Sequence, residues 1–193
     1  MQTENALSKS ISYLALLTGT LLLIPLAAMQ FTDEVTWSLS DFILAGILIF
    51  GTGMSYLLIT RKSAQLAYRV AVGLGLFAGL FLILANLAVG IIGSEDNLIN
   101  LWYFGVILAG IAGSLLVRFH PKGMAFTMLA MILAQASVTL AAINKGMHLE
   151  PFSPLVEILG INALFIVLFA ISGLLFWYSD VISSNNNQDG VRS

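Results

Sequence analysis

The stretch RKSAQLAYRVAVGLGLFAGLFLILANLAVGII (61–92) decides the fold class of this chain, because it joins a basic segment to a long apolar run. About 20 predominantly apolar residues cross the hydrocarbon core of a bilayer as an α-helix, and the run from Tyr68 to Ile92 is long enough. Lys and Arg concentrate on the cytoplasmic side of such helices. The stretch therefore predicts a transmembrane helix that starts at the cytoplasmic face.

Similar apolar runs recur along the chain and predict an all-α, polytopic transmembrane bundle of six helices. Hydrophobic residues make up 59% of the chain and charged residues 9%, whereas soluble domains carry about 25% charged residues. The runs lack the alternation of barrel strands. We expect one bundle over residues 1–182 and a disordered polar tail over 183–193. The expected helices are Ile11–Met29, Leu39–Ile59, Tyr68–Ile92, Leu98–Val117, Gly123–Asn144 and Pro154–Tyr178.

Charges and aromatic rings give the same orientation for this bundle. Basic residues occupy every second connection, with Lys145 as the exception: Lys9, Arg61, Lys62, Arg69, Arg118, Lys122 and Arg192. Amphipathic rings, which prefer the headgroup level, are expected at the outer face as Trp37, Trp102 and Tyr103 and at the inner face as Tyr13, Tyr68, Trp177 and Tyr178. The pattern predicts that both termini are cytoplasmic.

Composition argues against several classes of function. Cysteine is absent, which excludes disulfides, thiolate metal sites and Cys nucleophiles. His120 and His148 are expected on opposite faces, about 30 Å apart, and so cannot share a metal or a haem within one subunit. The basic residues form no patch of the kind that binds nucleic acid. We therefore expect no catalytic residues, no cofactor and no metal site, and the chain is not expected to be an enzyme.

The turn Gly93-Ser94-Glu95-Asp96-Asn97 is the sharpest local motif. Glu95, Asp96 and Asn97 together offer carboxylate and amide oxygens, which are the ligands that Ca²⁺ and Mg²⁺ prefer. A second interpretation is a structural or partner-docking turn, in which Gly93 closes one helix and Asn97 caps the next. Both interpretations place the motif on the outer face.

Five polar residues within the expected helices form a second candidate site: Asn86, Gln135, Thr139, Glu157 and Asn162. Polar groups at membrane depth usually face the bundle interior or a cavity, so the five could line an outward-facing polar pocket with Glu157 as its ionisable group. Two alternatives compete with a pocket. The amides could bond across helices, and Glu157 could simply reach water from a first helical turn.

Local patterns predict how the helices begin and pack. Asp41 follows Ser38 by three residues, which is the spacing of a capping box. Gly75-x-x-x-Gly79 and Ala109-x-x-x-Gly113 predict faces on which helices approach closely. Three helix–loop units with an acidic outer turn also suggest three hairpins in a parallel pseudo-repeat, although hairpin stacking alone produces the same pattern.

Four short blocks stand out between Pro25 and Gln135: MQFTDEV (29–35), VGIIGSEDN (89–97), YFGV (103–106) and RFHPKGMA (118–125). Together they resemble a family of small, uncharacterised bacterial multi-pass inner-membrane proteins with a VGIIGSEDN-type turn. In that family a Pro commonly follows the Asn of the turn, whereas Leu98 stands there in this chain. The resemblance implies a bacterial inner membrane and no particular mechanism.

The sequence leaves two functions open. A chain of 193 residues with short connections and several glycine faces favours a non-catalytic accessory or scaffold subunit of a membrane assembly. Its partners would be the lipid bilayer and another membrane protein or further copies of itself. The alternative is a small carrier or channel that passes an ion or small solute through the outward-facing polar pocket.

Overall fold

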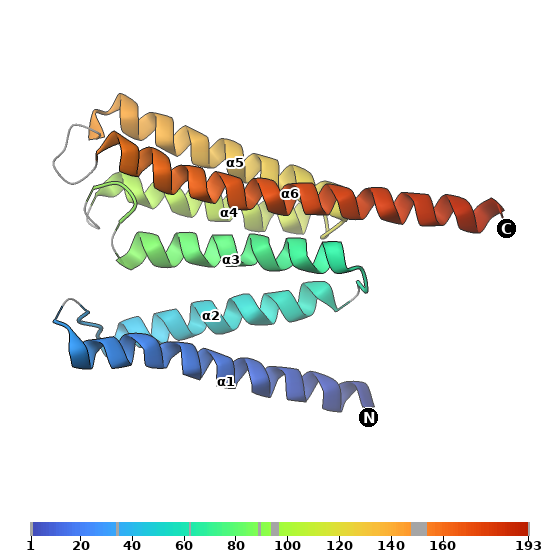
Figure 1. The fold of residues 1–193 in the computed structure, drawn as a ribbon, viewed down its shortest axis with the longest axis horizontal. Coiled ribbons are helices and arrows are strands. Elements are labelled where there is room, and N and C mark those ends of the chain that lie inside the picture. Colours follow the sequence, from blue (N-terminus) through green and yellow to red (C-terminus); the bar gives the residue numbers. More distant parts are fainter. Residues whose placement is uncertain are drawn as a thin grey trace. The chain divides into compact units, whose positions relative to one another are not determined.

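The computed structural model describes residues 2–33, 35–61, 63–88, 90–93, 97–147 and 154–192. These residues form helices and contain no strand (Figure 1), which confirms the all-α prediction. The elements are α1 (Gln2–Phe31), α2 (Leu39–Thr60), α3 (Leu66–Ala88), the short 3-10 helix η1 (Leu98–Leu101), α4 (Trp102–Leu116), α5 (Pro121–Asn144) and α6 (Leu155–Arg192).

Six of the described helical segments are long and apolar enough to cross a membrane, which confirms the predicted number of spans. Three boundaries differ clearly from the prediction. α1 begins at Gln2 instead of Ile11. α3 ends at Ala88 instead of Ile92, because Gly90 adopts a positive φ angle of 69°, which a right-handed helix does not continue through. α6 continues to Arg192, through the segment expected as a disordered tail.

Serine hydroxyls accompany this continuation of α6. Ser183 Oγ donates to Ser179 O at 3.0 Å, and Ser184 Oγ donates to Asp180 O at 3.0 Å. Both bonds run four residues back along the same helix, so the hydroxyls are paired without leaving the helical backbone.

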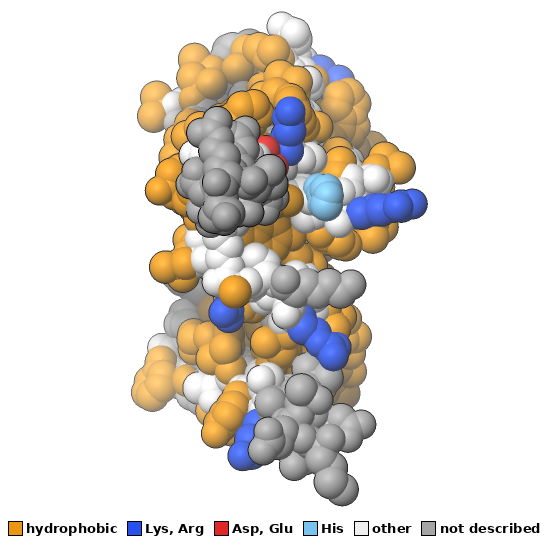
Figure 2. All heavy atoms as spheres, turned by 90° about the vertical axis from the view of Figure 1, so that its right-hand side faces the viewer, with side chains coloured by type: hydrophobic (Ala, Val, Ile, Leu, Met, Phe, Trp, Pro, Cys, Tyr) orange, Lys and Arg blue, Asp and Glu red, His pale blue; other side chains and the backbone are white. Residues whose placement is uncertain are grey.

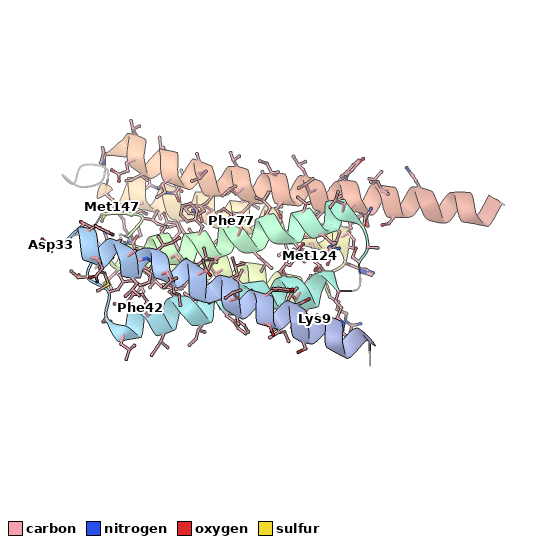
Figure 3. The ribbon with its side chains drawn as sticks, turned by 60° about the horizontal axis from the view of Figure 1, so that its bottom comes forward. Lys9, Asp33, Phe42, Phe77, Met124 and Met147 are labelled. Atoms are coloured by element: carbon pink, nitrogen blue, oxygen red, sulfur yellow. The ribbon has the colours of Figure 1, made fainter. Side chains whose placement is uncertain are left out.

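The described chain divides into two compact units, residues 1–58 and 59–193. The expectation of a single bundle over 1–182 stays a prediction. Unit 1 holds α1 and nearly all of α2. Lys9 and Asp33 lie toward opposite ends of α1 (Figure 3).

Capping and glycine contacts shape unit 1. Asp41 Oδ2 accepts hydrogen bonds from the amide and the hydroxyl of Ser38, each at 2.7 Å, which confirms the predicted cap. A Cβ atom at Gly53 would overlap Leu14, and one at Gly46 would lie 3.4 Å from Leu22 Cδ1. Side chains of α1 therefore occupy the space above glycines of α2.

Unit 2 is organised around α6, which packs against both α3 and α5, while α4 packs against α5. The buried positions of α6 recur at alternating intervals of four and three residues, which is the 3.5-residue period of coiled-coil packing. Each is at most 1% exposed: Ile158, Asn162, Phe165, Phe169, Ser172, Phe176 and Ser179. We call this row the α6 seam.

Small residues let the helices of unit 2 approach the seam and one another. A Cβ at Gly75 of α3 would lie 3.0 Å from Ser172 Oγ. A Cβ at Gly113 of α4 would lie 2.7 Å from Thr127 Cγ2 and 2.9 Å from Thr127 Oγ1 on α5. Both glycines belong to the predicted close-packing faces, so these two contacts confirm that interpretation.

Gly113→Ala is expected to lower the free energy of unfolding by about 1–3 kcal/mol, because the added methyl group forces α4 and α5 apart. The matched control is Gly105→Ala on the same helix, where nothing lies within 4 Å of the added atom. That control should be neutral or stabilising by up to about 1 kcal/mol. Thermal unfolding in detergent compares the two, and an equal shift in both variants would contradict the packing argument.

Candidate functional site

The side chain of Asn162 joins three helices in the interior of unit 2. Its Oδ1 accepts a hydrogen bond from the Tyr103 hydroxyl of α4 at 2.9 Å and another from Gln135 Nε2 of α5 at 2.8 Å. Its Nδ2 donates to Ile158 O, one turn back on α6, at 2.8 Å. We call Tyr103, Gln135 and Asn162 the amide cluster.

The carbonyl of Ile158 sets the direction of every bond in this cluster. A carbonyl only accepts, so the NH₂ group of Asn162 must face Ile158 and its oxygen must face Tyr103 and Gln135. Gln135 then turns its own NH₂ group toward Asn162. Gln135 Oε1 points elsewhere and has no hydrogen-bond partner.

Burial makes these bonds important for stability. Tyr103 is 1% exposed, Gln135 0% and Asn162 1%, and a bilayer supplies no water to replace a broken bond. Interhelical hydrogen bonds in membrane proteins contribute about 0.6–2 kcal/mol each. Thr139 lies beside the cluster and donates from Oγ1 to Gln135 O at 2.9 Å.

A second group of amides holds Ile91 and Ile92, which follow α3, against the end of the bundle. Asn100 Oδ1 accepts from the amides of Ile91 and Ile92 at 3.2 and 3.0 Å, and Asn100 Nδ2 donates to Ile92 O at 3.2 Å. Asn86 Nδ2 donates to Asn100 O at 3.0 Å. Ile92 is fully buried as a result.

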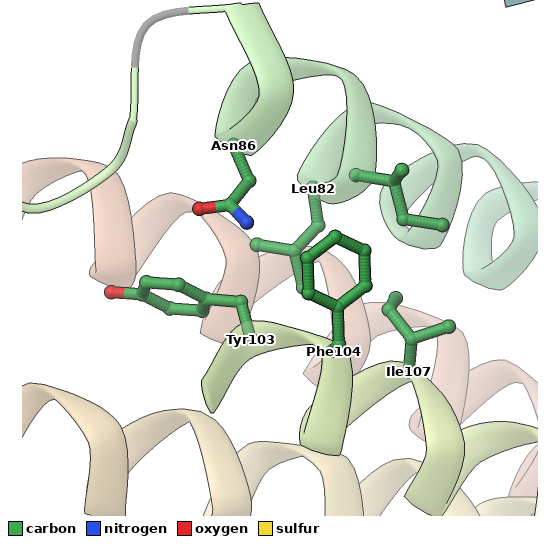
Figure 4. Close-up of a pocket in the computed structure, with 6 residues that line it drawn as sticks. Leu82, Asn86, Tyr103, Phe104 and Ile107 are labelled. Atoms are coloured by element: carbon green, nitrogen blue, oxygen red, sulfur yellow. The ribbon is translucent and has the colours of Figure 1, made fainter. Parts of the chain in front are cut away.

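A recess between α3 and α4 links the two groups (Figure 4). Asn86 and Tyr103 lie at one end of it, and the remaining wall is apolar. The recess has no room for a water molecule. Asn86 Oδ1 is buried without a hydrogen-bond partner, as is Gln135 Oε1. The lining residues are Leu82, Ile83, Asn86, Tyr103, Phe104 and Ile107.

The structure brings together part of the predicted polar pocket. Gln135 and Asn162 bond directly, Thr139 bonds to the backbone of Gln135, and Asn86 belongs to the second amide group. Glu157 does not join them, because it is exposed in the first turn of α6. Asn86, Gln135, Thr139 and Asn162 thus form hydrogen-bonded groups in the interior. Glu157 belongs to neither group.

The predicted outer turn is described only in part. Glu95 and Asp96 lie outside the described residues. Asn97 caps η1, because its Oδ1 accepts from the amide of Ile99 at 3.1 Å, as the structural interpretation of this turn predicts. Asn97 Nδ2 also lies 3.4 Å from Met147 Sδ, which ties Asn97 to the segment that follows α5.

Two members of these groups were not among the predicted site residues. Tyr103 was expected beside Trp102 at the outer interface, but it is 1% exposed while Trp102 is 49% exposed. Consecutive helical residues point about 100° apart, so the spacing itself signals that only one of the two rings can face lipid. Asn100 is an amide within an expected apolar span. A polar residue at such a position indicates an interior hydrogen bond, so its sequence position could have identified it.

Lys145, the basic residue that breaks the alternating charge pattern, has a local partner. Its Nζ lies 5.0 Å from the centroid of the Trp102 ring, a distance at which a cation is attracted to the face of an aromatic ring. This contact accounts for a lysine at the end of α5 where the charge pattern predicts none.

These features define an integral membrane protein with a bonded polar interior, built from helices that can each cross a bilayer. Among the described residues, no group of three or more His, Cys, Asp or Glu side chains could hold a metal ion. No protein-family model, curated protein or solved structure matches the chain.

Asn162→Leu is expected to lower the free energy of unfolding by about 2–5 kcal/mol, because it leaves the Tyr103 hydroxyl and the Gln135 NH₂ group without their acceptor. Ser137→Ala is the control, since that exposed hydroxyl bonds only to Leu133 O of its own helix. Chemical unfolding in detergent measures both variants. A loss no larger than that of the control would mean that the amide cluster does not hold the helices together.

Asn100→Ala should leave the amides of Ile91 and Ile92 without an acceptor and speed their hydrogen exchange. A buried amide left without an acceptor costs about 1–3 kcal/mol, so the equilibrium constant for local opening should rise by about 5- to 150-fold. Asn144→Ala, at an exposed position at the end of α5, is the control. Unchanged exchange over residues 90–93 would show that Asn100 does not hold this segment.

Proposed function

We propose that the protein serves as a non-catalytic accessory or scaffold subunit of a membrane assembly. Its membrane is the inner membrane of a bacterium, with both termini in the cytoplasm. The observation that carries the proposal is the use of interior polar side chains as bonds between helices. Such bonds make a bundle rigid, which is the property that a scaffold requires.

These bonds reach every helix of unit 2. The amide cluster connects α4, α5 and α6. Ser172 Oγ of the α6 seam donates to Ala71 O of α3 at 2.9 Å, and Gln65 Nε2, just before α3, donates to Ser179 O at 3.0 Å. Polar groups fixed in this way are not available to bind and release a solute, so they favour a structural role.

Unit 1 supports the same proposal from its surface. The most apolar windows of α1 and α2 are each 6% buried, compared with 39% for α5. Large apolar side chains on both helices are exposed, among them Ile24 at 66% and Ile47 at 65%. Within unit 1, α1 and α2 leave these apolar side chains to lipid or to other helices, and the proposal assigns part of this surface to another subunit.

Gentle extraction at natural expression level, followed by intact-complex mass determination, tests this proposal. We expect recovery with a stoichiometric membrane partner. Gly51→Leu should reduce that recovery, because Gly51 lies on the weakly buried α2 and nothing is within 4 Å of its Cβ position. Gly160→Leu on α6, which is equally open, is the matched control. Recovery of the chain alone would reject the subunit role.

One observation favours a small carrier or channel as the second candidate. Asn86 Oδ1 and Gln135 Oε1 are buried acceptors without a donor, and a permeating cation or hydrogen-bond donor could bind such oxygens. Proteoliposomes loaded with Na⁺ or K⁺ test this role directly. Equal flux in the unaltered protein, Asn86→Leu and Glu157→Gln would remove it.

A further inference from the structure

One end of unit 2 carries a group of exposed cationic side chains. They come from the connection before α3 and the first turn of α3, and from the connection between α4 and α5 and the first turn of α5. The bond from Tyr68 to Phe119 brings these segments together. Figure 2 looks onto this end and shows blue Lys and Arg side chains near a pale-blue His, with a red acidic side chain beside them. We call the group the basic end, and it consists of Arg61, Arg69, Arg118, His120 and Lys122, all exposed.

The α4–α5 connection is held rigidly beneath these charges. Arg118 and Phe119 both adopt left-handed backbone angles, with φ of 50° and 60°. The hydroxyl of Tyr68, from α3, donates to Phe119 O at 2.8 Å. Tyr68 is 5% exposed, and its ring packs edge-on against the ring of Phe176, with 5.5 Å between the two ring centroids. The turn therefore presents Arg118 outward from a fixed backbone.

Exposed aromatic rings lie at the same end. Trp177 and Tyr178 of α6 are 49% and 58% exposed. The ring of Trp177 lies edge-on to that of Phe126 in the second turn of α5, with 6.3 Å between the ring centroids. The bond between Gln65 and Ser179 brings this part of α6 beside the connection before α3. Amphipathic rings prefer the headgroup level of a bilayer, so their position puts the basic end among lipid headgroups.

We propose that the basic end binds the phosphate groups of anionic phospholipids, with Arg69, Arg118 and Lys122 as its principal cations. Asp180 is the described acidic side chain on the adjoining stretch of α6, and the basic end sets Arg61, Arg69, Arg118 and Lys122 against it, so positive charge prevails there. The cations are exposed instead of enclosing one ion, which suits a layer of headgroups better than a single free phosphate. Basic residues next to a membrane surface attract anionic lipid at about fivefold in affinity per cation. This inference is independent of the proposed scaffold role.

Native mass spectrometry of the purified full-length protein in detergent tests the inference with phosphatidylglycerol and phosphatidylcholine as competing lipids. The unaltered protein should retain phosphatidylglycerol preferentially. Arg118→Gln combined with Lys122→Gln should weaken that retention by about 25-fold. Lys145→Gln is the matched control, because it removes one cation from the opposite end of α5, and it should change retention by less than about twofold.

Three results would overturn the assignment. The first is equal retention of the two lipids by the unaltered protein. The second is an equal loss of phosphatidylglycerol retention in the double variant and in the Lys145→Gln control. The third is displacement of phosphatidylglycerol by inorganic phosphate or by polyglutamate. Thermal unfolding in phosphatidylcholine micelles checks that the double variant is folded. If it is not, Arg118→Lys combined with Lys122→Arg replaces it and should keep the lipid preference, because the charges remain.

Discussion

The NH₂ group of Asn162 donates to the carbonyl of Ile158, and this bond sets the direction of the amide cluster inside unit 2. Once the NH₂ group is committed there, one oxygen remains for Tyr103 and Gln135, and it binds both. In water such a choice would cost little, because solvent can complete any unpaired group. Inside a bilayer there is no such solvent. The direction of one amide therefore sets the positions of side chains on three helices.

The same constraint separates what could be predicted from what could not. The length of each apolar run alone predicts the spans, because an α-helix pairs all its backbone N–H and C=O groups within one segment, as lipid requires. The end of α3 could not be predicted from apolarity, since Ile91 and Ile92 are as apolar as the helix before them and leave it through the positive φ of Gly90. Their amides turn instead to Asn100, eight or nine residues away.

Side-chain partners across helices were the least predictable part of the candidate site. The polar character of Gln135 and Asn162 marks them as interior, but only the fold shows that they meet. Tyr103 was misplaced because an aromatic ring near a span end suits the headgroup level as well as a polar core. Glu157 shows the reverse case, where a residue within an apolar run reaches the surface because it lies in the first turn of α6.

The central position of α6 also imposes an order on biosynthesis. Ser172 bonds to a carbonyl of α3 that lies 101 residues earlier in the chain, a distance that a ribosome covers in about 5–20 s. Gln135 is made 27 residues before its partner Asn162, so for about 1–5 s its amide lies in an earlier helix while the α6 seam is incomplete. The nascent chain must wait in the membrane with polar groups uncovered, and its assembly is completed from the last helix backward.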